Sequence, residues 1–165
     1  MNYVIIIPDF GRKKEPKDVE LLYQASKEFY SRRTIDSFKQ IFTLRPEYAW
    51  LAEKEENILS ETDLKEKKIG NIIKGVYFTK TRKGWMPISH YKYILIERDV
   101  AYIDFITSFL IGKGITKHLF PKMVDKMKKK GVKKIKLVPY SKLNHKIFKE
   151  KFGFKDEGDF LVKHV

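Results

Sequence analysis

The stretch FLIGKGITKHLF, residues 109–120, contains two glycines one residue apart and lies between two patterns of different period. The apolar run Val100–Thr107 before it is typical of a strand. After the glycines, apolar residues recur at helical spacing, at Ile115, Leu119, Met123 and Met127. A strand, a glycine turn and a helix start form a phosphate-binding arrangement, because glycines let the backbone approach an anion and the free N–H groups of the helix face it.

Two common nucleotide-binding motifs do not fit this stretch. A P-loop needs a glycine followed five residues later by Gly-Lys-Ser/Thr, and that spacing does not occur in the chain. A dinucleotide-binding fingerprint needs a third glycine, where this chain has Lys117. A turn in which the glycines serve only geometry therefore remains an alternative.

The segments after the helical pattern follow a recognisable order. Gly131 ends the pattern, Val132–Val138 is typical of a strand, a shorter helical segment follows, and Phe152–Phe154 holds a Gly-Phe pair. Together with Gly112–Ile115, this order resembles the GCN5-related N-acetyltransferase (GNAT) family over residues 99–160. In that family the amides of a glycine turn hold the pyrophosphate of acetyl-coenzyme A (acetyl-CoA).

The resemblance is not complete. Ile111 replaces the usual leading Arg or Gln of the turn, and Thr116 replaces its last small residue. Lys149 stands where many members carry a tyrosine general acid, and Asn144 lies two residues beyond the family's frequent asparagine position. Pro121 falls inside the expected long helix and is expected to kink it, because proline removes a helical hydrogen bond.

The resemblance implies a fold and a reaction. It implies one α/β domain over residues 1–165, with a mixed, mostly antiparallel sheet and helices on both faces. It implies an N-acetyltransferase in which an amine attacks the thioester of acetyl-CoA directly. The resemblance implies three groups of residues that contact the co-substrate. A backbone N–H of Phe105, Ile106 or Thr107 would donate to the oxyanion, and Asn144 and Lys149 would contact the co-substrate from the last helix. The pyrophosphate would be held by the charges of Lys113 and Lys117 and by the amides of Ile111, Gly112, Lys113, Gly114, Ile115 and Thr116.

Asp104 is the only carboxylate in the run Val100–Thr107. Alternate residues of a strand share a face, so Tyr102, Asp104 and Ile106 are predicted to point together. A carboxylate buried beside a cleft is expected to have a raised pKa, which suits a general base. A structural aspartate, hydrogen-bonded or paired with a lysine, is the alternative. For the general acid we consider Tyr140 first, then Tyr102, with Lys149 able to steady the leaving thiolate.

Composition limits the function classes. The chain has 165 residues, a formal net charge of +14 and no cysteine, which excludes disulfides and thiol catalysis. From Gly112 to Lys155 lysines are dense, and Asp125 and Glu150 are the only acids, so a phosphate-rich partner is favoured. The four histidines show no metal-ligand spacing, so no metal is expected. With no long apolar run, we expect a cytoplasmic protein without a membrane partner.

Two other interpretations of the sequence stay open beside the acetyltransferase. One is a GNAT-fold protein without catalysis that binds coenzyme A as a regulator. Another is a basic domain that associates with nucleic acid, including an enzyme whose acceptor is charged tRNA. The acceptor is an unidentified amine on a small molecule, a protein or a tRNA, and a homodimer is an open alternative to a monomer.

The remaining segments are predicted as follows. Strands are expected at 2–7, 48–53, 71–79, 91–96 and 159–162, and helices at 16–31 and 34–42, with Leu143, Ile147, Phe148 and Phe152 as the apolar stripe of the last helix. Residues 54–69 are expected to be a charged surface excursion with a short helical turn, and 85–90 an irregular apolar segment. By the resemblance, Tyr23, Phe29, Tyr30 and Arg33 are candidates to line the acceptor pocket, and 17–45 and 80–96 carry its specificity.

Overall fold

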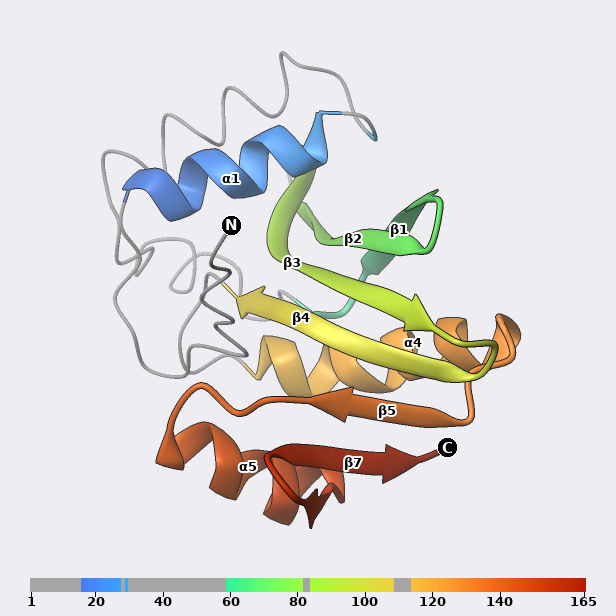
Figure 1. The fold of residues 1–165 in the computed structure, drawn as a ribbon. Helices are drawn as coiled ribbons and strands as arrows, with labels where there is room; N and C mark the ends of the chain where they lie inside the picture. The colour runs from blue at the N-terminus through green and yellow to red at the C-terminus, as the bar shows by residue number, and fades with distance from the viewer. Residues whose placement is uncertain (1–15, 28, 30–58, 82–83, 109–113) are drawn as a thin grey trace.

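In this computed structural model the structure describes residues 16–27, 29, 59–81, 84–108 and 114–165 (Figure 1). The strands predicted at 2–7 and 48–53 and the helix predicted at 34–42 lie outside the described residues. Within the described part, strands form one sheet and helices cover both of its faces (Figure 1). The predicted α/β class, with a mixed and mostly antiparallel sheet, is confirmed.

The sheet runs in the order β1-β2-β3-β4-β5-β7-β6 over seven strands of the described chain. All neighbouring pairs are antiparallel except β4 and β5, which are parallel. The parallel pair needs a crossover connection, which the chain supplies through α4. The strands are β1 Thr62–Ile69, β2 Ile72–Thr81, β3 Gly84–Ile96, β4 Val100–Ser108, β5 Lys134–Leu137, β6 Lys155–Glu157 and β7 Phe160–His164.

The helices are α1 Pro16–Ser26, α4 Ile115–Lys129 and α5 Lys142–Phe152. Two consecutive residues of β2 show that α1 and α4 cover opposite faces, because neighbouring side chains of a strand point to opposite sides. The Tyr77 hydroxyl lies 2.5 Å from Nδ1 of His118 in α4. The Phe78 ring packs edge-on against Phe29, just after α1, with ring centroids 6.3 Å apart.

Two segments were predicted wrongly. Residues 62–69 form β1 rather than a surface excursion with a helical turn. β1 is an edge strand, where charged side chains are favoured because they discourage pairing with another chain, and these charges hide the strand pattern. Residues 85–90 belong to the long strand β3 rather than to an irregular segment. Met86–His90 is buried throughout, so this part of β3 lacks the alternation that marks a half-exposed strand.

Asp104 occupies a β-bulge of β4. Its neighbours Ile103 and Phe105 pair with consecutive residues of β3, so no residue of β3 lies opposite Asp104. The extra residue inverts the alternation beyond it, and Phe105 lies on the same face as Tyr102. The predicted common face of Tyr102, Asp104 and Ile106 is therefore wrong for Ile106, which shares the opposite face with Ile103.

The C-terminal helices pack as their sequences predict, with one exception. The rings of Phe120 from α4 and Phe148 from α5 each pack against the rings of Phe152 and Phe154 and against one another, with centroids 4.6–6.3 Å apart. Leu143 was predicted to belong to the apolar stripe of α5, but its side chain is 50% exposed. It lies in the first turn of α5, beside the exposed cap Ser141 rather than in the aromatic cluster.

Candidate functional site

The strands β4 and β5 part in the middle of the sheet. They pair only from Val100 to Tyr102 on β4 and from Lys134 to Lys136 on β5, although β4 continues to Ser108. From Ile103 onward, no described residue of β5 pairs with that edge of β4. A strand edge without a partner strand offers backbone N–H and C=O groups to a ligand that lies along it.

The helix α4 begins beside the end of this open edge. Its N-cap Gly114 has φ 68° and ψ 26°, a left-handed conformation that glycine adopts readily. The Ser108 and Thr116 hydroxyl oxygens lie 2.6 Å apart and tie the end of β4 to the first turn of α4. The first turn holds no acidic residue, and its N–H groups have no acceptor within the helix. The strand end and the helix start lie where the sequence predicts them, and phosphate binding at this helix start stays a prediction.

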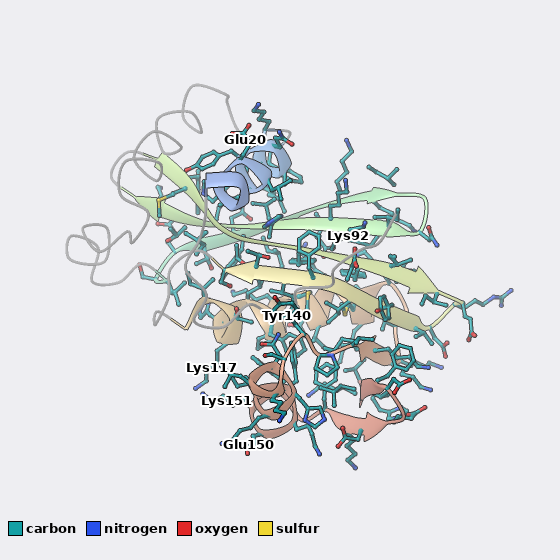
Figure 2. All side chains as sticks on the ribbon, turned by 60° about the vertical axis from the view of Figure 1, so that its left-hand side comes forward. Glu20, Lys92, Lys117, Tyr140, Glu150 and Lys151 are labelled. Atoms are coloured by element: carbon teal, nitrogen blue, oxygen red, sulfur yellow. The ribbon has the colours of Figure 1, made fainter. Side chains whose placement is uncertain are left out.

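The structure places the predicted phosphate-binding residues only in part. Ile111, Gly112 and Lys113 lie outside the described residues. Ile115 and Thr116 are buried, so their side chains serve packing, and their amides remain at the helix start. Lys117 is exposed in the first turn of α4 and adds a positive charge there (Figure 2).

The predicted general base has a cationic partner. Asp104 is 7% exposed, and its carboxylate lies 3.2 Å from Nζ of Lys92 on β3. The alternative interpretation, in which a lysine pairs with this aspartate, thus describes the resting structure. Tyr102 is half-buried, and burial, with a smaller effect of the Asp104 charge, raises its pKa. A tyrosine whose pKa is raised stays protonated, so it remains a hydrogen-bond donor.

The other predicted site residues follow β5 in the chain. Tyr140 follows β5 and is 47% exposed (Figure 2). Asn144 in α5 is buried, and its backbone N–H donates to the Ser141 hydroxyl at 3.2 Å. Lys149 forms an ion pair with Asp156, and this lysine, followed by His145, lowers the pKa of Asp156. The structure therefore gives Lys149 an ion-pair partner on β6.

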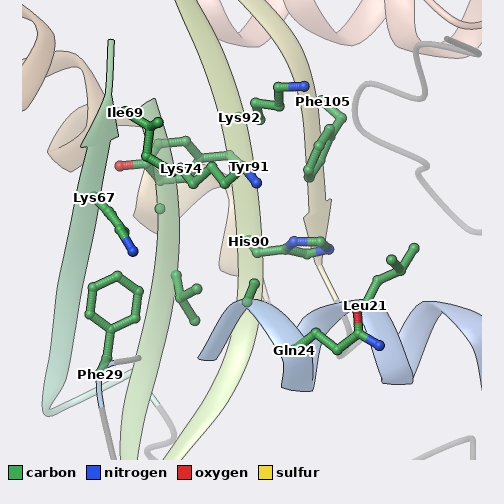
Figure 3. A pocket seen from close by; sticks show the side chains of 13 residues that line it. Leu21, Gln24, Phe29, Lys67, Ile69, Lys74, His90, Tyr91, Lys92 and Phe105 are labelled. Atoms are coloured by element: carbon green, nitrogen blue, oxygen red, sulfur yellow. The ribbon is translucent and has the colours of Figure 1, made fainter. Parts of the chain in front are cut away.

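A cavity of about 370 Å³ lies between α1 and the face of the sheet made by β1 to β4 (Figure 3). Phe105 reaches it from β4, next to Asp104, so the cavity adjoins the open part of that strand. Phe29, a predicted pocket residue, lines it, whereas Tyr23 is fully buried in the core. Tyr30 and Arg33 lie outside the described residues. The lining comprises Leu21, Gln24, Ala25, Phe29, Lys67, Ile69, Lys74, Gly75, Val76, His90, Tyr91, Lys92 and Phe105.

Sequence reasoning missed the polar lining of this cavity. Lys67, Lys74, His90 and Lys92 were not singled out, although the last two fall in the segment 80–96 that was expected to carry specificity. A signal existed, because the turn at Gly70 makes Lys67 and Lys74 cross-strand neighbours once residues 62–69 are taken as a strand.

Two further observations concern the described part of the chain. No group of three or more His, Cys, Asp or Glu side chains there is placed to hold a metal ion. None of the described helices is long and apolar enough to cross a membrane.

The fold has known counterparts among solved structures. No protein-family model matches the chain, and no curated protein matches it in sequence. A GNAT family acetyltransferase from Elizabethkingia anophelis with acetyl-CoA bound superposes with a TM-score of 0.50 at 13% identity, over 64% of this chain and 99% of that one. A Bacillus subtilis acetyltransferase in complex with CoA superposes with a TM-score of 0.50 at 14% identity, over 64% and 98%. The resemblance predicted from residues 99–160 is confirmed at the level of the fold, which is GNAT-like.

Proposed function

We propose that this protein is an N-acetyltransferase that transfers the acetyl group of acetyl-CoA to an amine. The proposal is supported by one observation, that an open strand edge and a free helix start lie next to each other in a GNAT-like fold. The edge of β4 is open beyond Tyr102, and the helix start at Gly114 follows the end of the same strand. An extended chain with a phosphate at one end fits such an edge, because the edge pairs with the chain and the helix start holds the anion.

The co-substrate is held mainly by backbone groups. The amides at the start of α4 take the pyrophosphate, and the exposed Lys117 adds a charge beside them. A backbone N–H among Phe105, Ile106 and Thr107 donates to the thioester oxygen as it gains negative charge. The Ser89 hydroxyl donates to the Thr107 carbonyl at 2.7 Å and fixes this end of β4.

The transfer itself needs a base and an acid. The acceptor nitrogen forms a bond to the acetyl carbon, the carbon–sulfur bond breaks, and one proton leaves the nitrogen while one reaches the sulfur. Asp104 is proposed as the base, because its buried carboxylate lies on the open part of β4, beside Phe105 and Lys92, which line the cavity. Tyr140, which follows β5, and Tyr102 on β4 are the proposed donors to the sulfur.

Calorimetric titration with acetyl-CoA tests the binding step. The wild type is expected to bind, and Lys117→Glu is expected to bind about tenfold more weakly, because a negative charge replaces a positive one at a helix start. Lys122→Glu is the matched control, since Lys122 is an exposed lysine of α4 outside its first turn. Absence of wild-type binding would overturn the proposal. Equal weakening in both variants would assign the effect to the net charge.

Release of the free thiol tests the chemical step. The chain contains no cysteine, so a thiol reagent reports only coenzyme A. With an active acceptor, Asp104→Asn is expected to lower kcat by about 10²–10⁴-fold while acetyl-CoA still binds. A variant with unchanged kcat would remove Asp104 from the mechanism. Binding of acetyl-CoA without thiol release in a broad amine screen would instead support the regulator that binds coenzyme A without catalysis.

A further inference from the structure

The cavity beneath α1 contains a row of like charges. Lys67 of β1 pairs with Lys74 of β2, Lys74 pairs with Lys92 of β3, and Lys92 pairs with Phe105 of β4. Residues directly opposite one another in an antiparallel sheet point to the same face, so three ammonium groups lie on one face in register. We call Lys67, Lys74 and Lys92 the lysine row. All three line the cavity, as Figure 3 shows.

A lysine row of this kind is unfavourable for stability alone. Like charges directly opposite in a sheet destabilise the pairing, and the strands are only about 4.8 Å apart. At the Lys92 end of the row, the Asp104 carboxylate lies 3.2 Å from Nζ of Lys92. No carboxylate belongs to the described lining of the cavity.

The remaining walls make this cavity suitable for a small organic molecule. Leu21 and Ala25 of α1 and Val76 of β2 are apolar, and the rings of His90 and Phe105 pack edge to face with centroids 4.9 Å apart. A volume of about 370 Å³ lies within the range of small-molecule sites, which pair apolar walls with a few polar groups that fix orientation.

The lysine row also determines which end of a bound molecule faces the open edge of β4, where the transfer is proposed to occur. Phe105 lines the cavity, and both Phe105 and its chain neighbour Asp104 lie on the open part of β4. Lys74 lies two strands away from Phe105, which corresponds to about 10 Å across the sheet. A molecule that lies along the row therefore presents one end to the reacting edge and the other end to Lys74 and Lys67.

We propose that the acceptor is a small amine that carries an anionic group, a carboxylate or a phosphate, and that Lys74 holds this anion while the amine lies near Asp104. The proposal rests on the acetyltransferase function proposed above. It deepens that function by naming the substrate class, because the lysine row repels a second positive charge and attracts an anion.

Binding of matched probes tests the anion site without any chemistry. β-Alanine, γ-aminobutyrate and phosphoethanolamine, the acidic members, are each compared by ligand-observed NMR with β-alaninamide, γ-aminobutyramide and ethanolamine, which keep the amine but lack the carboxylate or phosphate. The acidic member of each pair is expected to bind about tenfold or more tightly, because a charge-assisted hydrogen bond to an ammonium group is a strong one. The phosphate and carboxylate pairs distinguish the two kinds of anion.

The variants assign this preference to the row. Lys74→Gln is expected to remove the preference for the acidic member. Lys68→Gln is the matched control, because Lys68 is the neighbour of Lys67 on β1 and points to the opposite face. The same pairs are then assayed for thiol release with acetyl-CoA. We expect kcat/KM to favour the acidic member, and Lys74→Gln to act through KM.

The outcomes separate the two proposals. Acidic binding that depends on Lys74, without thiol release, supports the anion site and contradicts the acetyltransferase function. Thiol release at equal rates for acidic and neutral amines, unchanged by Lys74→Gln, overturns the anion site and leaves the acetyltransferase function standing. If the acidic probes bind no more tightly than their counterparts, the anion site is overturned, whether or not acetyl-CoA binds or releases its thiol.

Discussion

Gly75 on β2 shows how one buried ring decides the identity of its neighbour. The Tyr91 ring, 1% exposed, covers the position that a Cβ of residue 75 would occupy. The Tyr91 hydroxyl donates to Glu66, whose carboxylate also accepts from Lys130 at 2.6 Å. Burial first, and then the Glu66 charge, raise the pKa of Tyr91, so the phenol keeps the proton that it donates. The ring is held at both ends and has little room to move aside.

We therefore expect Gly75→Ala to lower the free energy of unfolding by about 1–3 kcal/mol, the usual range for overpacking a core. Thermal and urea denaturation measure the change. Because the cause is a clash with one ring, Tyr91→Leu is expected to relieve it, with a coupling energy of about 0.5–3 kcal/mol in a double-mutant cycle. Additive effects of the two substitutions, or an unchanged stability of Gly75→Ala, would contradict this explanation.

Among the elements, the long strands and α4 were predicted well because their signals are local. The runs at 71–79, 91–96 and 100–107 and the helix from Ile115 each carry their own periodicity. β1 was missed because its charges belong to an edge strand, and the length of β3 was missed because Met86–His90 is buried on both faces. These two properties depend on which elements lie alongside, and a single-strand pattern does not contain that information.

The candidate site was predicted from the sequence only where it depends on chain order. Gly114 and the end of β4 were identified because a strand, a turn and a helix follow each other in the chain. The bulge at Asp104 and the lysine row depend on register, which is set between strands. A one-residue bulge changes the face of Ile106, and no pattern within β4 marks it.

The lysine row makes a prediction about stability at the level of the β1–β2–β3 element. Removing one charge from the row is expected to raise stability, so Lys74→Gln should increase the free energy of unfolding by about 0.2–1 kcal/mol at low ionic strength. Lys68→Gln, on the other face of β1, should change it less. Added salt should reduce the difference, because it screens the repulsion between exposed charges. A loss of stability in Lys74→Gln would show that the row is not repulsive.

At the scale of the whole molecule, the described residues share one sheet and one cluster of buried side chains, which joins Leu22 of α1 to Leu161 of β7. The proposed acetyl-CoA site lies between the central strand β4 and the helix α4, and both contribute to this cluster through Ile103 and Met123. A ligand bound there is coupled to the stability of the whole cluster, provided that residues 1–165 form the single domain expected from the sequence.

Thermal unfolding followed by calorimetry tests this coupling. A single cooperative transition is expected, and acetyl-CoA at one hundred times its Kd should stabilise the native state by about 2.7 kcal/mol, because it binds the folded chain only. In a chain of 165 residues this corresponds to a rise in Tm of about 5–10 °C, since about 1 kcal/mol moves the Tm of a domain of this size by 2–4 °C. Lys117→Glu should shift less at the same ligand concentration, whereas Lys122→Glu should follow the wild type. Two transitions, of which acetyl-CoA moves only one, would divide the chain into separate units and contradict the single domain.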